Sequence, residues 1–293
     1  MEKIIPEFLV NKIKTEYPED AELLLDGLKK KKKTTFRVNR IKSNIQEIEE
    51  ILQKNEIDFS WLDEIEDAFI VEKDNEETIR KLDIYKEGKI YLQSLSSMLP
   101  VLVLDPKEKE NILDMCAAPG GKTTQIASIT NNRTFITACE KNKIRYDRLK
   151  FNLEKQGVKN FNLMQEDSRN LNDFFKFDKI LLDTPCSGSG TEAIYHESFS
   201  EEFVERISKV QEALLRKAIK LVNPGSIIVY STCSILKEEN ERILEKVKDL
   251  VEMVPIQQIN NKKINFLRGL ERTITICPNE YFEGFFVAKL VKK

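Results

Sequence analysis

The sequence predicts an α/β protein with a mostly parallel sheet covered by helices on both faces, preceded by a smaller α/β region. From residue 111 onward, short apolar runs alternate with longer segments of helical periodicity, which is the order that builds a parallel sheet. The length of 293 residues exceeds that of a typical single domain, so we expect a core of ordinary size with an appendage. We place the boundary near Gly88, between residues 1–87 and 88–293, to within several residues.

The region before this boundary has the pattern of a small α/β unit. A strand-like apolar piece at 35–39 precedes apolar residues at helical spacing over 45–52, and a second strand-like piece follows at 69–71. Beyond the boundary we expect an apolar helix over 91–104, ended by Asp105-Pro106.

The later elements follow in order along the chain. The expected strands are 111–115, 134–139, 161–165, 179–183 and 226–232, with late strands at 272–276 and 284–290. The expected helices are 122–129, 143–156 and 201–221, the last with Ser200 as its N-cap and 223–225 as its stop. Ligands of such sheets bind outside the carboxyl ends of the strands, so the polar residues at these ends are the candidates for a site.

The cysteine and histidine content excludes several kinds of site. The five cysteines are odd in number, widely spread and without a Cys-x-x-Cys pair, which indicates free thiols and neither a disulfide framework nor a thiolate zinc site. His196 is the only histidine, so we expect no metal and no Ser-His-Asp hydrolase. No apolar run approaches a membrane span and no secretory core opens the chain, which favours a cytoplasmic protein.

Charge gives a divided indication about partners. The net charge of −2 argues mildly against nucleic acid, whereas Lys29 to Lys33 are five consecutive lysines. Such a run is either a solvated loop or a patch that contacts phosphates, and both interpretations stay open on charge alone.

A glycine turn follows the strand expected at 111–115. Its end imitates a phosphate-binding P-loop, but that motif requires a glycine at position 116, where Cys116 stands; the dinucleotide pattern Gly-x-Gly-x-x-Gly is also absent. Backbone N–H groups of the turn 119–121 at a helix start would suit a carboxylate, and S-adenosylmethionine carries one. Glu140 lies about twenty residues on, where an acid usually holds ribose hydroxyls. S-adenosylmethionine is therefore the cofactor that fits best.

Two aspartates follow the next expected strands. Asp167 and Asp183 are either helix caps or ligand-binding carboxylates, and their place among other polar strand ends favours the second interpretation. In that arrangement Glu140 takes the ribose, Asp167 the adenine amino edge, and Asp183 faces the substrate. Arg145 pairs with Glu140, reaches the cofactor or is a surface charge.

Cys186 and Cys233 stand after two neighbouring expected strands. Carbon 5 of cytosine is not nucleophilic until a group adds to carbon 6, and a thiolate is both a strong nucleophile and a good leaving group. Free cysteines are most often small buried apolar residues, which we expect for Cys139 and Cys277. The polar surroundings of the first pair indicate methyl transfer to a cytosine instead.

Three long segments, 115–124, 182–191 and 229–235, resemble the NSUN-type (Sun domain, RsmB/RsmF-like) RNA cytosine-5 methyltransferases. The resemblance spans about 34–291 and implies a Rossmann-like class I methyltransferase domain behind a small RRM-like, RNA-binding region. It implies that Cys233 is the nucleophile, that Cys186 helps to release the enzyme, and that Lys122 and Asp183 lie near the target base. It also implies a cofactor site made of Cys116, Ala117, Ala118, Pro119, Gly120, Gly121, Lys122, Glu140, Asp167 and Asp183.

The resemblance leaves the kind of RNA open, rRNA or tRNA, and implies that the target base is unpaired or flipped out. The segment 192–197 departs from the basic stretch that many relatives have there, and no additional RNA-binding domain fits in the length. A methyltransferase acting on a protein or a small molecule and a catalytically silent RNA-binding relative are the alternatives. A monomer is the favoured state.

Overall fold

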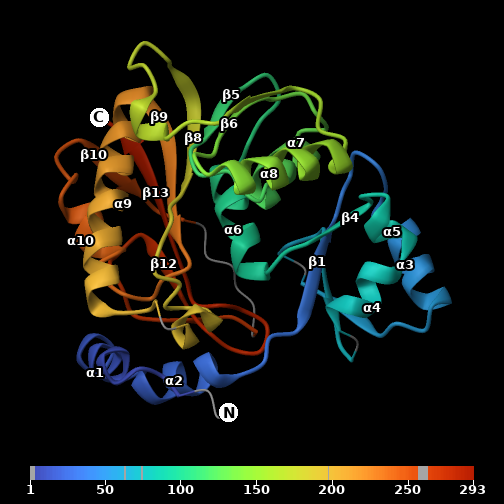
Figure 1. Ribbon diagram of the computed structural model, residues 1–293, viewed down its shortest axis with the longest axis horizontal. Helices are drawn as coiled ribbons and strands as arrows, with labels where there is room; N and C mark the ends of the chain where they lie inside the picture. Colours follow the sequence, from blue (N-terminus) through green and yellow to red (C-terminus); the bar gives the residue numbers. More distant parts are fainter. Residues whose placement is uncertain (1–3, 63, 74, 197, 257–262) are drawn as a thin grey trace.

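The computed structural model describes residues 4–62, 64–73, 75–196, 198–256 and 263–293. A small antiparallel sheet has the order β2-β3-β1-β4. Its strands are β1 (Thr34–Val38), β2 (Phe59–Trp61), β3 (Ala68–Val71) and β4 (Ile90–Leu92), and its helices are α3 (Ile45–Lys54), α4 (Glu76–Lys81) and α5 (Asp83–Lys86). Figure 1 shows this small domain beside the large sheet.

Helix α3 illustrates how the small domain forms. Asn44 caps it by accepting a hydrogen bond from the backbone N–H of Glu47, and its buried residues Ile48 and Leu52 face the sheet. Behind them Phe36 of β1 stacks on Phe69 of β3, with 5.2 Å between ring centroids. The apolar spacing over 45–52 predicted this helix correctly.

The helix predicted over 91–104 is wrong at its start. Ile90–Leu92 form β4, which pairs with β1, and helix α6 (Leu95–Leu104) begins only after its N-cap Ser94. A short apolar run has no periodicity that separates a strand from a helix, so only the pairing decides. The boundary drawn near Gly88 stays a prediction, with β4 belonging to the small sheet.

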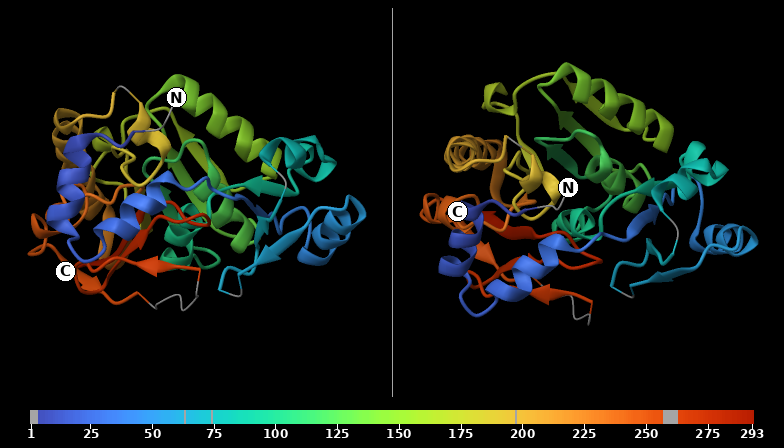
Figure 2. Two further views of the ribbon diagram at one scale, coloured as in Figure 1. Left: turned by 90° about the horizontal axis from the view of Figure 1, so that it is seen from below. Right: turned by 60° about the horizontal axis from the view of Figure 1, so that its bottom comes forward.

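The first two helices lie apart from the small sheet that follows them. Helices α1 (Glu7–Glu16) and α2 (Ala21–Lys29) pack against the large domain. Leu9 of α1 and Leu24 of α2 share a core with Ile235. The Tyr17 hydroxyl donates to the backbone oxygen of Ile235 at 2.8 Å. In Figure 1 the blue helices α1 and α2 lie below the large domain, and in the view from below in Figure 2 they lie in front of it, away from the small sheet.

The large sheet has nine strands within the described ranges, in the order β11-β12-β13-β9-β8-β5-β6-β7, with β10 paired to β13. The parallel part consists of β5 (Asn111–Asp114), β6 (Phe135–Cys139), β7 (Phe161–Met164), β8 (Phe177–Asp183) and β9 (Val222–Thr232). The antiparallel edge consists of β13 (Phe285–Lys292), β12 (Thr273–Cys277), β11 (Asn265–Phe266) and β10 (Val251–Val254).

Helices cover both faces of this sheet, as the sequence predicts (Figure 1). Alternate residues of β8 enter the two cores: Leu181 packs with α6, α7 (Gly121–Ile129) and α8 (Lys143–Gln156), while Ile180 and Leu182 pack with α9 (Glu201–Leu221) and α10 (Glu241–Glu245). Short 3-10 turns, η1 (Ser168–Asn170) and η2 (Glu192–Tyr195), follow β7 and β8. Within the described ranges, no helix combines the length and apolar character that a bilayer crossing requires.

Arg37 of β1 joins the small sheet to the large domain. Its side chain is buried, and its guanidinium donates to the Gln93 side chain at 2.8 Å, to the Thr124 hydroxyl at 2.6 Å and to the backbone oxygen of Gly121 at 3.0 Å. The same group lies 5.1 Å from the centroid of the Tyr91 ring. A strand of the small domain thus fixes the first turn of α7.

Replacing Arg37 with Met is expected to lower the free energy of unfolding by about 2–4 kcal/mol, because buried acceptors on Gln93 and α7 lose their donor. Urea unfolding followed by circular dichroism measures this. The matched control is Arg40→Met, because Arg40 pairs with Glu66 and Asp67 at the surface and its loss should cost less than about 1 kcal/mol. Equal losses in the two variants would contradict the linking role of Arg37.

Candidate functional site

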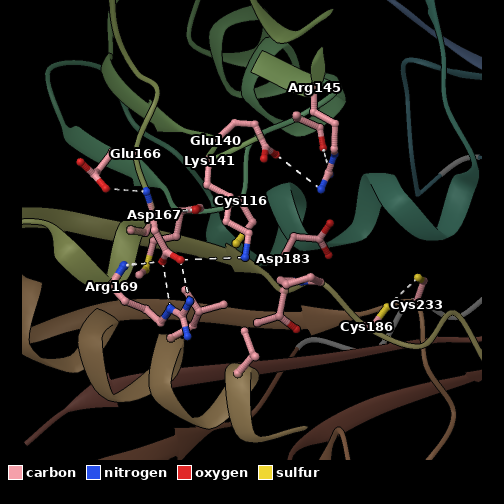
Figure 3. A pocket seen from close by; sticks show the side chains of 17 residues that line it. Cys116, Glu140, Lys141, Arg145, Glu166, Asp167, Arg169, Asp183, Cys186 and Cys233 are labelled. Carbon is pink, nitrogen blue, oxygen red and sulfur yellow. Dashed lines mark hydrogen bonds and ion pairs between the residues drawn. The ribbon is translucent and has the colours of Figure 1, made fainter. Parts of the chain in front are cut away.

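The carboxyl ends of the parallel strands surround one cavity of about 350 Å³. Side chains from loops after β5, β6, β7, β8 and β9 line it, among them Cys116, Glu140, Asp167, Asp183, Cys186 and Cys233. Figure 3 shows Asp167 and Arg169 at one end of this cavity, Cys186 and Cys233 at the other, and Asp183 between them. The structure therefore brings the predicted site residues of five strands together.

The glycine turn after β5 forms one wall. Gly120 has a φ of 107°, a left-handed conformation that suits glycine, and it stands directly before α7. Two side chains of α8 hold the turn: Arg145 donates to the backbone oxygen of Ala118 and Asn152 to that of Pro119, each at 2.7 Å. The conformation of the turn is thus fixed by α8.

Glu140 follows β6 and lies at the same wall. One carboxylate oxygen accepts from the backbone N–H of Asn142 at 2.8 Å, and the other lies 3.5 Å from the Arg145 guanidinium. Only 4% of the Glu140 side chain is exposed. Of the alternatives for Arg145, pairing with Glu140 is the one present, and Arg145 also lines the cavity.

Asp167 follows β7 and caps η1. Arg169 holds both of its carboxylate oxygens, at 2.9 and 2.6 Å, and this guanidinium lowers the pKa of Asp167 below its ordinary value. Lys141 lies 3.9 Å away. Asp167 is therefore both a helix cap and a cavity-lining carboxylate. Arg169 and Lys141 also line the cavity, and the sequence analysis did not identify them.

Asp183 ends β8 between a cation and a hydroxyl. Its Oδ2 lies 2.7 Å from Lys122 Nζ, and its Oδ1 accepts from the Ser231 hydroxyl at 2.7 Å. Lys122 also donates to the Ser97 hydroxyl at 2.6 Å. Ser97 and Ser231 had no distinguishing signal in the sequence, because they reach Asp183 and Lys122 only through the tertiary fold.

A second hollow of about 210 Å³ adjoins the cavity and shares Cys116, Ala118 and Asp183 with it. Lys122 and Asp114 also line this hollow. The Asp114 carboxyl accepts from the Thr123 hydroxyl at 2.7 Å, and its Oδ1 has no hydrogen-bond partner among the described residues. Burial raises the pKa of Asp114 to about 6.

The two thiols of the predicted pair are in contact. The Sγ atoms of Cys186 and Cys233 are 2.8 Å apart, and both cysteines are free. The hydrogen bond with Cys233, followed by burial, raises the pKa of Cys186 above its ordinary value. Cys139 and Cys277 are fully buried, so the prediction that they are apolar core residues is confirmed.

A close approach of two glycines fixes the loop after Cys233. Gly190 donates its backbone N–H to the Cys233 oxygen at 3.1 Å and accepts from the Gly284 N–H at 2.8 Å. A Cβ atom on Gly190 would lie 2.1 Å from the backbone oxygen of Gly284, so no larger residue fits. The Ser-Gly-x-Gly segment therefore serves backbone packing next to the thiol.

Other features singled out in the sequence lie outside the cavity. Lys32 donates to the backbone oxygens of Gly27 and Asn279, and Lys33 donates to that of Glu72, so the lysine run is not one free patch. His196 does not line the cavity. The described residues contain no group of three or more histidine, cysteine, aspartate or glutamate side chains placed to hold a metal ion.

Comparison with known proteins gives two family matches. The family described as 16S rRNA methyltransferase RsmB/F matches residues 101–291, and its ferredoxin-like domain model matches residues 5–76. The solved methyltransferase homologue protein of Pyrococcus horikoshii superposes with a TM-score of 0.81 at 28% identity, over 99% of this chain and 100% of that one. NSun6 of Pyrococcus horikoshii, solved with SFG, has the same fold, with a TM-score of 0.89 at 24% identity over 100% and 99% of the two chains.

Curated relatives are similar across much of the chain. The tRNA (cytosine(72)-C(5))-methyltransferase of Pyrococcus horikoshii is 38% identical over 73% of this chain and 55% of its own length. Ribosomal RNA small subunit methyltransferase F of Vibrio vulnificus is 32% identical over 98% of this chain and 64% of its own length. The chain thus spans between half and two thirds of the length of these two relatives.

The raised pKa of Asp114 predicts how stability depends on pH. The folded carboxyl titrates near pH 6, above its ordinary 3.8, so its contribution to stability is fully present below about pH 4 and is lost as the pH rises through 6. The variant Asp114→Asn should therefore be more stable than the parent at pH 7.5, by on the order of 2–3 kcal/mol, with the difference vanishing toward pH 4. Urea unfolding across this range measures it, and a pH-independent difference would contradict the assignment.

Proposed function

Because the chain belongs to the family described as 16S rRNA methyltransferase RsmB/F, we propose that it transfers a methyl group from S-adenosylmethionine to carbon 5 of a cytosine in RNA. The observation that carries the proposal is the contact between Cys186 and Cys233, beside the carboxylate of Asp183 in one cavity. A methyltransferase for a protein or a small molecule needs neither thiol.

The cavity fits the proposed cofactor. Its volume of about 350 Å³ lies in the range of small-molecule sites. Glu140 would offer a buried carboxylate to the ribose hydroxyls, Asp167 would accept from the adenine amino group, and the turn through Ala118 and Gly120 would receive the methionine end. Bound S-adenosylmethionine supplies an electrophilic methyl group. Cys116 to Lys122 and Arg145 complete this site.

Cys233 is the nucleophile in the proposed mechanism. Its thiolate forms a bond to carbon 6 of the cytosine, which moves an electron pair toward ring nitrogen 3 and makes carbon 5 nucleophilic. Asp183 contacts nitrogen 3 and the exocyclic amino group, and the Nζ atom of Lys122 lies 2.7 Å from this carboxylate. Lys122 supplies, by way of Asp183, the proton that nitrogen 3 takes up, and receives it back when carbon 5 forms its bond to the methyl group. Carbon 5 takes the methyl group and then loses its proton to a base.

Cys186 assists the last step. When the bond from Cys233 to carbon 6 breaks, the electron pair returns to the Cys233 sulfur, and the ring recovers its double bond. The thiol of Cys186, 2.8 Å away, donates a hydrogen bond to that departing thiolate. Its raised pKa keeps it protonated for this role.

A third hollow of about 410 Å³ supports RNA as the substrate. It lies between the small domain and α8, shares Tyr91, Leu92 and Pro119 with the hollow at Lys122, and is lined by cations and rings, including Arg148 and Phe151. Phe151 is 61% exposed. Rings that stack on bases and cations that contact phosphates form the usual platform for single strands, so an RNA strand lies along this hollow with its target base next to Lys122.

The kind of RNA and the setting complete the proposal. The curated relatives act, by their names, on a tRNA cytosine and on ribosomal RNA, and either is the substrate class here. Residues 1–87 are the RNA-binding region and 88–293 the methyltransferase domain. An enzyme that needs two free thiols suits a reducing compartment, so we place it in the cytoplasm, as a monomer.

The two thiols should fail at different steps. With RNA and labelled S-adenosylmethionine, Cys233→Ala should give no methylation and no covalent complex, because no bond to carbon 6 can form. Cys186→Ala should transfer the methyl group and then remain attached to RNA on denaturing gels. Cys277→Ala, a buried control, should behave like the parent. Methylation of a protein acceptor, or a stable adduct with Cys233→Ala, would overturn the proposal.

Arg148 tests the proposed RNA track. Arg148→Gln should weaken binding of every single-stranded RNA and flatten the slope of log affinity against log salt by roughly 0.7, the value for one phosphate contact. Lys248→Gln changes an exposed cation three residues beyond the end of α10 and should leave the slope unchanged. Fluorescence anisotropy at several salt concentrations measures both. Identical slopes for Arg148→Gln and the parent would contradict the proposal that RNA lies along this hollow.

A further inference from the structure

A buried carboxylate lies directly behind the two thiols and has no part in the proposed chemistry. Glu239, in the segment between β9 and α10, is fully buried. No lysine or arginine among the described residues forms an ion pair with it; its partners are neutral groups. A buried charge without a cation requires several good hydrogen bonds, so the arrangement of its donors is informative.

Four donors saturate this carboxylate. Its Oε2 accepts from the backbone N–H of Ser187 at 2.8 Å and from the Gln211 side chain at 2.9 Å, and its Oε1 accepts from the hydroxyls of Ser234, at 2.7 Å, and of Ser187. Ser187 directly follows Cys186 in the chain, and Ser234 directly follows Cys233. One side chain thereby holds both thiol-bearing turns.

The neighbouring hydrogen bonds fix the direction of these hydroxyl protons. The Ser234 oxygen accepts from the Leu236 N–H at 3.1 Å, and the Ser187 oxygen accepts from the Ser189 N–H at 3.2 Å. The Ser189 hydroxyl lies 2.7 Å from that of Ser234 and itself accepts from the Ile235 N–H at 3.0 Å, so it can donate its proton to Ser234. The protons of Ser187 and Ser234 can then both point at Glu239. Burial raises the pKa of Glu239 above its ordinary value, and the hydrogen bonds from Ser187, Ser234 and Gln211 act in the opposite direction because each of these groups donates to the carboxylate.

The adjacent Asn240 secures the other side of the nucleophile. Its side-chain oxygen accepts from the Thr232 hydroxyl at 2.6 Å, and its side-chain nitrogen donates to the backbone oxygen of Ser234 at 2.9 Å. Cys233 thus lies between Thr232 and Ser234, and Asn240 forms hydrogen bonds with both of these neighbours. The turn of Cys186 is held by hydrogen bonds in the same way. Glu239 accepts from the N–H of Ser187, and Gln211 donates to the backbone oxygen of Pro185 at 3.0 Å.

We propose that Glu239 is a positioning residue that clamps the turns of Cys186 and Cys233 against each other and so maintains the contact between the two thiols. The inference rests on the proposed function for its meaning in catalysis, whereas the clamp itself concerns the geometry of the protein alone. Attack and release need two sulfurs at fixed separation, and displacement of one turn disturbs both steps.

Disulfide formation between the thiols tests the clamp without RNA or cofactor. Diamide takes up two electrons and two protons as Cys186 and Cys233 join, and peptide mass spectrometry follows the linked product. In Glu239→Gln the amide N–H would face other donors, and this repulsion displaces the two thiol turns. A disulfide forms only within a narrow range of Cβ–Cβ distances, so the rate of linkage should fall about tenfold. The control Glu241→Gln alters a second buried glutamate with no hydrogen bond to either thiol turn, and should link at the parental rate.

Catalysis gives a second measurement. If the proposed function holds, Glu239→Gln should lower kcat for RNA methylation roughly 100-fold and leave KM for RNA and for S-adenosylmethionine within about twofold, because only the reacting sulfurs are displaced. An inactive parent would defeat the proposed function and leave the linkage test of the clamp intact.

The linkage rate of a variant tests the clamp only if that variant folds. A folded Glu239→Gln protein, judged by circular dichroism, that links its thiols at the parental rate would overturn the proposal. If Glu239→Gln does not fold, Ser187→Ala takes its place, because it removes one donor to the clamp and keeps the backbone N–H. Slower linkage in Ser187→Ala supports the clamp, and an unchanged rate overturns it.

Discussion

The parallel pairing of β8 with β9 is the constraint on which the site depends. In this register Asp183 stands opposite Ser231, so the two chain segments leave the sheet side by side. The turn with Cys186 follows the first strand and Cys233 follows the second, and their thiols meet although 47 residues separate them in the chain. A shift of this register by one residue would turn Ser231 to the opposite face and separate the sulfurs.

Around this contact the nearby carboxylates have partners of their own. Asp183 is shared between Lys122 and Ser231, and Glu239 is satisfied by neutral donors. Arg37 extends the same support from the small domain to the start of α7, from which Lys122 projects. The small sheet therefore supports the first turn of α7, and through it the position of Lys122 in the site.

The sequence was sufficient for elements with strong periodicity. Helices α8 and α9 begin and end where predicted, and the residues at the carboxyl ends of the strands line one cavity because parallel strands leave no other arrangement. It was insufficient where partners are distant in the chain: β4 is recognised only by its pairing with β1, and Glu239 only by its hydrogen bonds to Ser187 and Gln211. The packing of α1 and α2 on the large domain also depends on partners that are distant in the chain.

The claim most central to this account is that Cys233, held beside Cys186, forms the bond to carbon 6. RNA that contains 5-fluorocytidine tests it directly. Fluorine replaces the carbon 5 proton that the base must remove, so the adduct persists after methyl transfer. Digestion and mass spectrometry of the complex should locate the nucleotide on the peptide that contains Cys233. Attachment to the Cys186 peptide, or methylation of ordinary RNA without any adduct on the fluorinated substrate, would contradict the account.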